Sequence, residues 1–263
     1  MSEQITGDID VAARNHRERI AISIEEQRRW RDPNAALSHW IQAIEALGCL
    51  VFQASGIEVR EMRGISFHHP YAPAILLNTA DAPRGRIFTL LHEYSHLILG
   101  AGGLCDYSEP INARSATAKT EVFCNKFAAS VLLPADDLGE HAIVRAHVRR
   151  RRWNDEELSK LSVDYSVSSE AILRRLVGLE LASLEDYEDR RGGFIGATPK
   201  YHQKGKANSG GLPWHKRVVK ANGKRFTRLV LSSYDEEFIT GSDLAEYLGT
   251  DLKHLPAIER EVS

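Results

Sequence analysis

Long hydrophobic runs are missing from this 263-residue sequence. A membrane-spanning helix needs about 20 consecutive apolar residues, and no segment approaches that length. The first ten residues, MSEQITGDID, also lack the basic and apolar regions of a secretory signal. These absences argue against a membrane protein and against export, and they predict a cytoplasmic location.

Cysteine is scarce, and neither acidic nor basic residues are in large excess. Cys49, Cys105 and Cys124 are an odd number at spacings that indicate no disulfide framework. Residues 1–140 carry 13 basic and 18 acidic side chains, and residues 141–263 carry 21 and 18, which together give a net charge of −2. Because a dedicated nucleic-acid binder needs a much stronger basic patch, DNA binding is possible but not favoured.

Apolar residues make up 43% of the chain, and their spacing predicts mostly helices around a small sheet. Asp32-Pro33 is a typical helix start. Three short apolar runs then predict strands at 49–52, 64–67 and 74–78. We therefore expect an α+β fold with a three-stranded sheet of mixed or antiparallel type.

The segment 84–99 has helical spacing and contains His92-Glu93-Tyr94-Ser95-His96. Residues four apart share one face of a helix, so His92 and His96 can both bind one zinc ion with Glu93 beside them. Zinc activates a water molecule, and Glu93 is the expected general base. The alternative is two unrelated surface histidines, because so short a motif also arises by chance.

A catalytic zinc ion usually has three protein ligands. A second helix, capped by Ser115 or Thr117 and ending near residue 133, carries Glu121 as a candidate for the third. Asp106 and Glu109 in the loop before it are rivals on spacing alone. Asn125, one turn after Glu121, is a candidate to orient a ligand side chain.

The flanking residues resemble the ImmA/IrrE-type metallo-endopeptidases of bacteria and their mobile elements. The likeness covers roughly residues 35–180 and depends on Arg63-Gly64-Ile65-Ser66, on the run 73–78, on 86–97, and on Glu121-Val122-Phe123-Cys124-Asn125 with the residues up to Pro134. It implies a zincin-like fold, zinc (with manganese as an alternative), and Glu121 as the third ligand. It also implies a protein substrate, a helix-turn-helix repressor or antitoxin-like regulator encoded nearby, cleaved in stress response or mobile-element control.

The composition changes after Pro134. We expect a zincin-like metallopeptidase domain over 1–140 and a helical C-terminal region over 141–263, with a flexible loop at 190–213. Residues 154–176 resemble a helix-turn-helix, with Arg174 and Arg175 on its second helix, and 239–249 is a weaker match. Packing or substrate docking is the favoured interpretation, and DNA contact is the alternative.

Weaker candidates lie near the predicted strands. His69 and Tyr71 could contact the substrate, and Leu76 belongs to the strand 74–78, which could pair with an extended substrate segment. An ordinary core strand is the competing interpretation. For the whole protein, the alternative to an endopeptidase is a non-proteolytic regulator of toxin–antitoxin or phage type that binds DNA or a partner and retains the peptidase fold.

Overall fold

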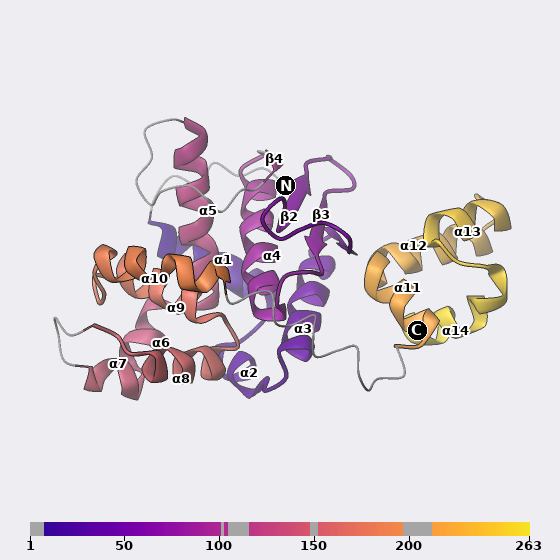
Figure 1. Ribbon diagram of the computed structural model, residues 1–263. Coiled ribbons are helices and arrows are strands. Elements are labelled where there is room, and N and C mark those ends of the chain that lie inside the picture. Colours follow the sequence, from indigo (N-terminus) through magenta and orange to yellow (C-terminus); the bar gives the residue numbers. More distant parts are fainter. Residues whose placement is uncertain (1–7, 101–102, 105–115, 148–151, 197–211) are drawn as a thin grey trace.

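The computed structural model describes residues 8–100, 103–104, 116–147, 152–196 and 212–263. Helices surround a small sheet, as Figure 1 shows. The elements in chain order are α1 (Ile9–Ile20), α2 (Ile24–Arg29), α3 (Pro33–Ala46), β1 (Leu50–Ala54), β2 (Gly64–Phe67), β3 (Ala74–Asn78), α4 (Pro83–Ile98), β4 (Gly103–Leu104), α5 (Ala116–Leu132), α6 (Ala135–Glu140), α7 (Ala142–Ala146), α8 (Asp155–Tyr165), α9 (Ser169–Gly178), α10 (Leu184–Gly196), α11 (Trp214–Asn222), α12 (Lys224–Asp235), α13 (Gly241–Leu248), η3 (Leu252–His254) and α14 (Leu255–Val262). The predicted α+β class is confirmed.

The strands form one mixed sheet in the order β1-β3-β2-β4. β3 runs parallel to β1 and antiparallel to β2, so both of its edges are hydrogen-bonded. The three predicted strands are present. β4 adds a fourth, pairing with β2 through Leu104 opposite Ile65. A strand of two residues is too short to produce a period-2 pattern, which is why the sequence did not predict it.

Helix α4 lies at the centre of the fold. It packs against the sheet through β2 and β3 and against helices α3 and α5 (Figure 1). Every residue from Arg86 to Ile98 is buried. A helix that is apolar or buried on all sides belongs in the core, and this burial removes the histidine motif from bulk water.

Buried side chains form two separate cores. The larger extends from Ala13 to Tyr187 and includes the helices after α5. The smaller lies within the C-terminal bundle, which comprises α11 to α14, and extends from Val218 to Val262. The division of the chain at residue 140 stays a prediction, although the buried side chains of residues 141–187 belong to the larger core.

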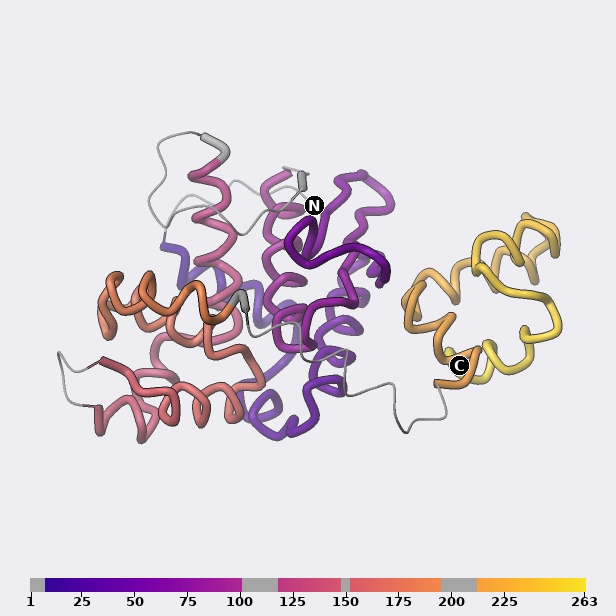
Figure 2. The backbone as a smooth tube through the Cα atoms, in the orientation of Figure 1, coloured from indigo at the N-terminus to yellow at the C-terminus, as the bar shows by residue number. Residues whose placement is uncertain are grey.

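The C-terminal bundle docks against β1 and α3, beside the rest of the chain (Figure 2). Gln53 Nε2 donates to the carbonyl oxygen of Lys220 over 3.0 Å, and the ring of Phe226 lies edge-on to that of Phe52. Helix α11 contacts β1, the end strand of the sheet. Covering an end strand protects its unpaired backbone groups from other chains.

Gly223, which joins α11 to α12, is required for this docking. Its φ of 77° and ψ of 155° suit glycine, and an added Cβ would lie 2.3 Å from Glu45 Oε1 and 2.5 Å from the Val51 carbonyl oxygen. Gly223→Ala should therefore destabilise the docked bundle by about 1–3 kcal/mol through backbone strain alone, and the clash with Glu45 and Val51 should add to this. Hydrogen exchange of the α11 and α12 amides would measure the loss.

The matched control is Gly139→Ala in α6, because a Cβ there meets no atom within 4 Å. Hydrogen exchange of the α11 and α12 amides in Gly139→Ala should equal that of the wild type. Unchanged exchange in Gly223→Ala would show that the bundle is not held by this close approach.

Part of the predicted loop at 190–213 is helical. Residues 190–196 form the end of α10, where Arg190 pairs with Asp186 and Asp155 and donates to the carbonyl oxygen of Trp153. The bonds to Asp155 and Trp153 join residues distant in the sequence and stabilise a segment whose glycines suggested a loop. Residues 197–211 lie outside the described part. Within that part, no helix combines the length and apolar character that crossing a membrane requires.

Candidate metal centre

The histidine motif occupies the buried second half of α4. Pro83 begins this helix, and Asp81 accepts from the backbone N–H of Ala82 just before it, so the predicted start is close to the observed one. His92 and Glu93 have no exposed surface, and His96 is 4% exposed. Two imidazoles and one carboxylate are thus held on a rigid element in a dry environment.

Helix α5 brings Glu121 to the two histidines. Glu121 Oε2 lies 3.2 Å from His92 Nε2, Glu121 Oε1 lies 3.1 Å from His96 Nε2, and the two Nε2 atoms are 3.1 Å apart. Ligands of a tetrahedral zinc ion with bonds of about 2.0–2.1 Å stand about 3.3–3.4 Å from each other. The three side chains therefore fit a zinc site closely, and they form the one candidate metal-binding group found among the described residues.

Asn125 completes the support of this ligand set. Its Oδ1 lies 3.1 Å from His92 Nδ1, so the ring can donate there and present Nε2 toward Glu121 and His96. Glu121 and Asn125 are four residues apart on α5 and share a face. The predicted contact of Asn125 with a ligand histidine is thus present in the geometry.

Asn125→Ala should weaken zinc binding about 10–100-fold without abolishing it, because the imidazole of His92 loses its orienting acceptor. Competition with a chelating dye would measure the affinity. Lys119→Ala, on the same helix at an exposed position, is the control and should bind zinc like the wild type. Equal affinities for the two variants would contradict an orienting role.

Glu93 is a buried carboxylate whose oxygens form no well-aligned hydrogen bond with a described residue. Neither of its oxygens receives a hydrogen bond from a described residue, and Ser66 on β2 faces it without reaching hydrogen-bonding geometry. Burial raises the pKa of Glu93 above its ordinary range. Such a group is costly for stability, so its presence beside three potential ligands indicates a role toward a metal ion, water or substrate.

The strand β2 is close to α4 at this point. A Cβ on Gly64 would lie 2.5 Å from Thr89 Cγ2 and 3.2 Å from Glu93 Cγ. Glycine therefore lets the strand approach the helix and keeps Glu93 against the sheet. The Arg63-Gly64-Ile65-Ser66 run, which contributed to the family resemblance, has a packing reason here.

His96 and Glu121 attract each other electrostatically. Burial lowers the pKa of His96, but hydrogen bonds with Cys124 and Glu121 outweigh it and raise the pKa to about 10. Burial likewise opposes ionisation of Glu121, but hydrogen bonds from His92 and His96 lower its pKa to about 2. A metal ion bound by both side chains would replace the proton of His96.

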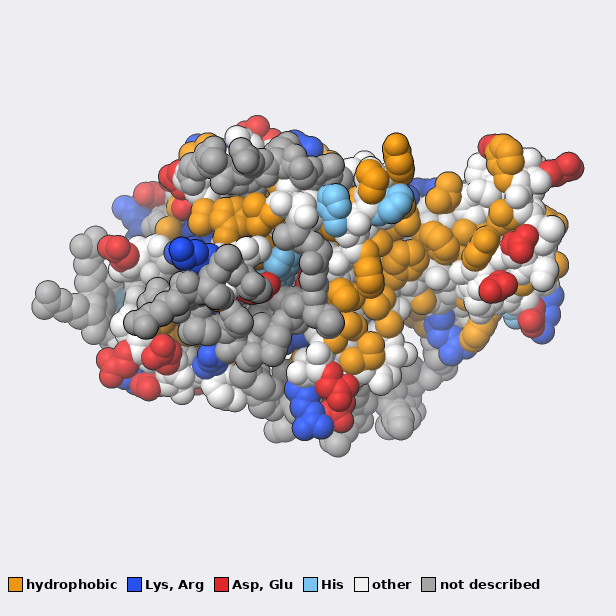
Figure 3. Space-filling view, turned by 90° about the horizontal axis from the view of Figure 1, so that it is seen from above, with side chains coloured by type: hydrophobic (Ala, Val, Ile, Leu, Met, Phe, Trp, Pro, Cys, Tyr) orange, Lys and Arg blue, Asp and Glu red, His pale blue; other side chains and the backbone are white. Residues whose placement is uncertain are grey.

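The predicted substrate contacts lie elsewhere. His69 and Tyr71 are in the exposed β2–β3 loop, where His69 Nδ1 accepts from the backbone N–H of Tyr71 and Ala72. Figure 3 shows hydrophobic side chains gathered on this side of the molecule, over the sheet and the C-terminal helices. The structure does not bring either residue into the ligand set, and their role stays a prediction.

Leu76 and its strand require a correction. β3 is an interior strand bonded on both sides, so the predicted pairing of a substrate segment with 74–78 is wrong. Side chains alternate along a strand, and Leu76 lies opposite Ile65 and Phe52. Gly64 is opposite Leu77 and faces Glu93, so Leu76 points to the other face of the sheet, away from the metal ligands.

The helix-turn-helix resemblance at 154–176 corresponds to α8 and α9, with Ser168 capping α9. Its arginines point inward. Arg175 is 6% exposed, pairs with Asp10 and donates to the Leu133 carbonyl oxygen, while Arg174 pairs with Glu170 over 3.2 Å. The second helix therefore packs against α5, which favours the packing interpretation over DNA contact.

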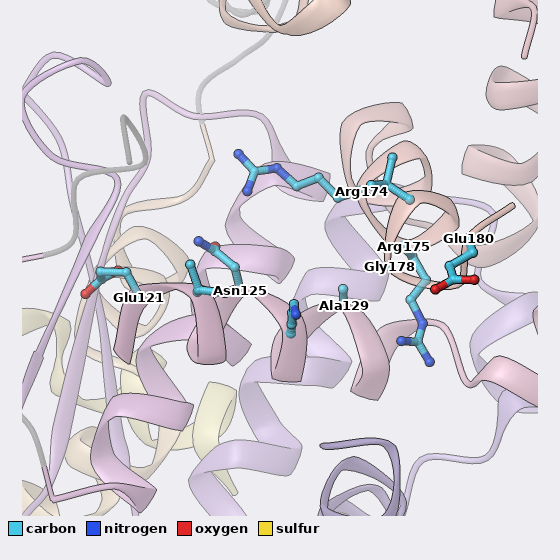
Figure 4. A pocket seen from close by; sticks show the side chains of 10 residues that line it. Glu121, Asn125, Ala129, Arg174, Arg175, Gly178 and Glu180 are labelled. Atoms are coloured by element: carbon cyan, nitrogen blue, oxygen red, sulfur yellow. The ribbon is translucent and has the colours of Figure 1, made fainter. Parts of the chain in front are cut away.

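Sequence reasoning missed the cleft beside the metal site. A cavity of about 230 Å³ runs along α5 from Glu121 and Asn125, and Arg174 on α9 lines it. Figure 4 shows these side chains, with Arg174 reaching over the cleft toward Asn125. The only signal of this cleft in the sequence was Arg174, an arginine on a helix that resembled a DNA-binding element. The rival ligands Asp106 and Glu109 lie outside the described residues.

The sequence matches a protein-family model. The peptidase family M78 model, described as the IrrE N-terminal-like domain, matches residues 44–177. This range contains the sheet, the four side chains of the candidate site, and the α8–α9 pair. No curated protein matches the sequence.

Proposed function

Because the chain belongs to the peptidase family M78, whose domain is described as IrrE N-terminal-like, we propose that it is a zinc-dependent endopeptidase. The family supports peptidase chemistry in general, and the buried His92, His96 and Glu121 suit a divalent metal ion. Two imidazoles and a carboxylate favour zinc, with manganese as the alternative. The observation that carries the proposal is the buried carboxylate of Glu93, which lies beside this complete ligand set without a well-aligned hydrogen bond to a described residue.

The residues divide the reaction between them. His92, His96 and Glu121 would hold the zinc ion, which supplies Lewis-acid chemistry by polarising the scissile carbonyl and acidifying water. Glu93 takes the proton of the attacking water and delivers it to the leaving amine. Burial raises its pKa, which favours the protonated form that delivers the proton to the leaving amine.

The proposed substrate is a helix-turn-helix transcriptional regulator encoded near this chain's gene. The resemblance to the repressor-cleaving ImmA/IrrE-type enzymes supports it. The packing of α9 against α5, with Arg175 paired to Asp10, speaks against DNA as the target of this helix pair and leaves a protein as the proposed partner. The proposed setting is stress response or mobile-element control in the cytoplasm.

Mixing the zinc-loaded protein with this regulator tests the proposal. We expect cleavage into two fragments, detected by mass spectrometry, that stops when a chelator is added and resumes with excess Zn²⁺ or Mn²⁺. Tight binding without cleavage would instead support a non-proteolytic regulator that retains the peptidase fold.

A further inference from the structure

The cleft beside the metal site begins at a metal ligand. Glu121 and Asn125 stand at one end, and Glu180, just after α9, stands at the other. Figure 4 shows this order along α5, with α9 forming the opposite wall. A substrate held at Glu93 for cleavage can extend along this cleft, because the cleft and the ligand set share Glu121.

Arg174 is a rigid part of the wall. Its side chain is only 11% exposed, Nε lies 3.2 Å from Glu170 Oε1, and its guanidinium stands over the ring of Tyr187 at 5.0 Å. It also lines a second, smaller cavity with Phe88 of α4. Arg174 therefore stands where α4, α5 and α9 meet, one side of it facing the cleft.

Lys126 on α5 is a second cation of the cleft, on the wall opposite Arg174. It is exposed and forms no ion pair with any residue in the described part of the chain. Four other charged residues line the cleft. Glu121 belongs to the metal site, Arg175 pairs with Asp10, and Glu180 lies at the far end. Arg174 pairs with Glu170, which does not itself line the cleft. Positive charge therefore prevails in the half of the cleft nearest the ligand set.

Building on the proposed function, we infer that this cleft binds the substrate segment next to the scissile bond and selects an acidic side chain there through Lys126 and Arg174. Lys126 lies about 7.5 Å beyond Glu121 along the helix. An extended peptide advances about 3.3 Å per residue, so the acidic residue lies about two positions from the scissile bond.

Capture from a random-peptide library tests the inference without requiring cleavage. Zinc-loaded Glu93→Gln protein should enrich Asp- and Glu-containing peptides over Lys- and Arg-containing ones about fivefold or more. Adding Lys126→Glu should reduce that preference below about twofold. Lys253→Glu makes the same charge change in the C-terminal bundle and should leave the preference intact.

Equal capture of acidic and basic peptides, or the same preference with Lys126→Glu as without it, would overturn the inference. Arg174→Lys keeps the charge but loses the planar guanidinium, and it should keep part of the preference. Peptide cleavage by the wild-type protein is read separately: a protein that cleaves nothing contradicts the proposed function, while the capture result still decides the selectivity.

Discussion

Glu93→Gln is expected to lower the rate of peptide-bond hydrolysis about 10²–10⁴-fold while the protein still binds one zinc ion. The amide has nearly the shape of the carboxylate, so the helix and the three metal ligands keep their places. It cannot accept the proton of the attacking water. Steady-state cleavage of the regulator, together with zinc content by elemental analysis, measures both quantities on one sample.

A glutamate-to-glutamine substitution at the protein surface provides the control. Glu246→Gln changes an exposed side chain of α13 and should leave both cleavage and zinc content unchanged. Burial disfavours the ionised form of Glu93, so the neutral amide of its variant should also resist thermal unfolding at least as well as the wild type. Activity within twofold of the wild type would remove Glu93 from the mechanism and leave the proposed base unassigned.

Local patterns predicted the central elements well. The spacing of His92 and His96 indicated a shared helix face, and short apolar runs predicted the three main strands. Each depends on a period of 3.6 or 2 residues within one segment, and such periods are visible in a single sequence.

Contacts between distant segments were harder to predict. Spacing alone did not distinguish Glu121 from Asp106 and Glu109 as the third metal ligand, and only the family resemblance favoured Glu121. The reason is that the third ligand depends on how α5 packs against α4. For Arg174, packing or substrate docking was favoured and DNA contact stayed the alternative, because the direction in which a helix faces is set by its packing partners. Leu76 was misplaced for a similar reason: alternation shows two faces of a strand but does not say which one meets α4.

Glu121→Gln is expected to remove most of the stabilisation that zinc gives the folded chain. At free zinc about 100 times the dissociation constant, binding stabilises the native state by about 2.7 kcal/mol, equivalent to about 5–10 °C in Tm for a protein of this size. Loss of one of three ligands should weaken affinity by more than about 100-fold, beyond the effect of a supporting residue. The zinc-induced rise in Tm should then nearly vanish.

The comparison is made within each variant, as Tm with zinc minus Tm with chelator, so that any change in the metal-free protein cancels. This matters because Glu121 also pairs with both histidines when no metal is bound. Glu109→Gln and Asp106→Asn test the rival ligands and should show the full wild-type rise. If the Glu109→Gln or the Asp106→Asn variant loses the zinc effect while Glu121→Gln keeps it, the third ligand comes from the residues before α5, and the pairing of Glu121 with His92 and His96 serves packing alone.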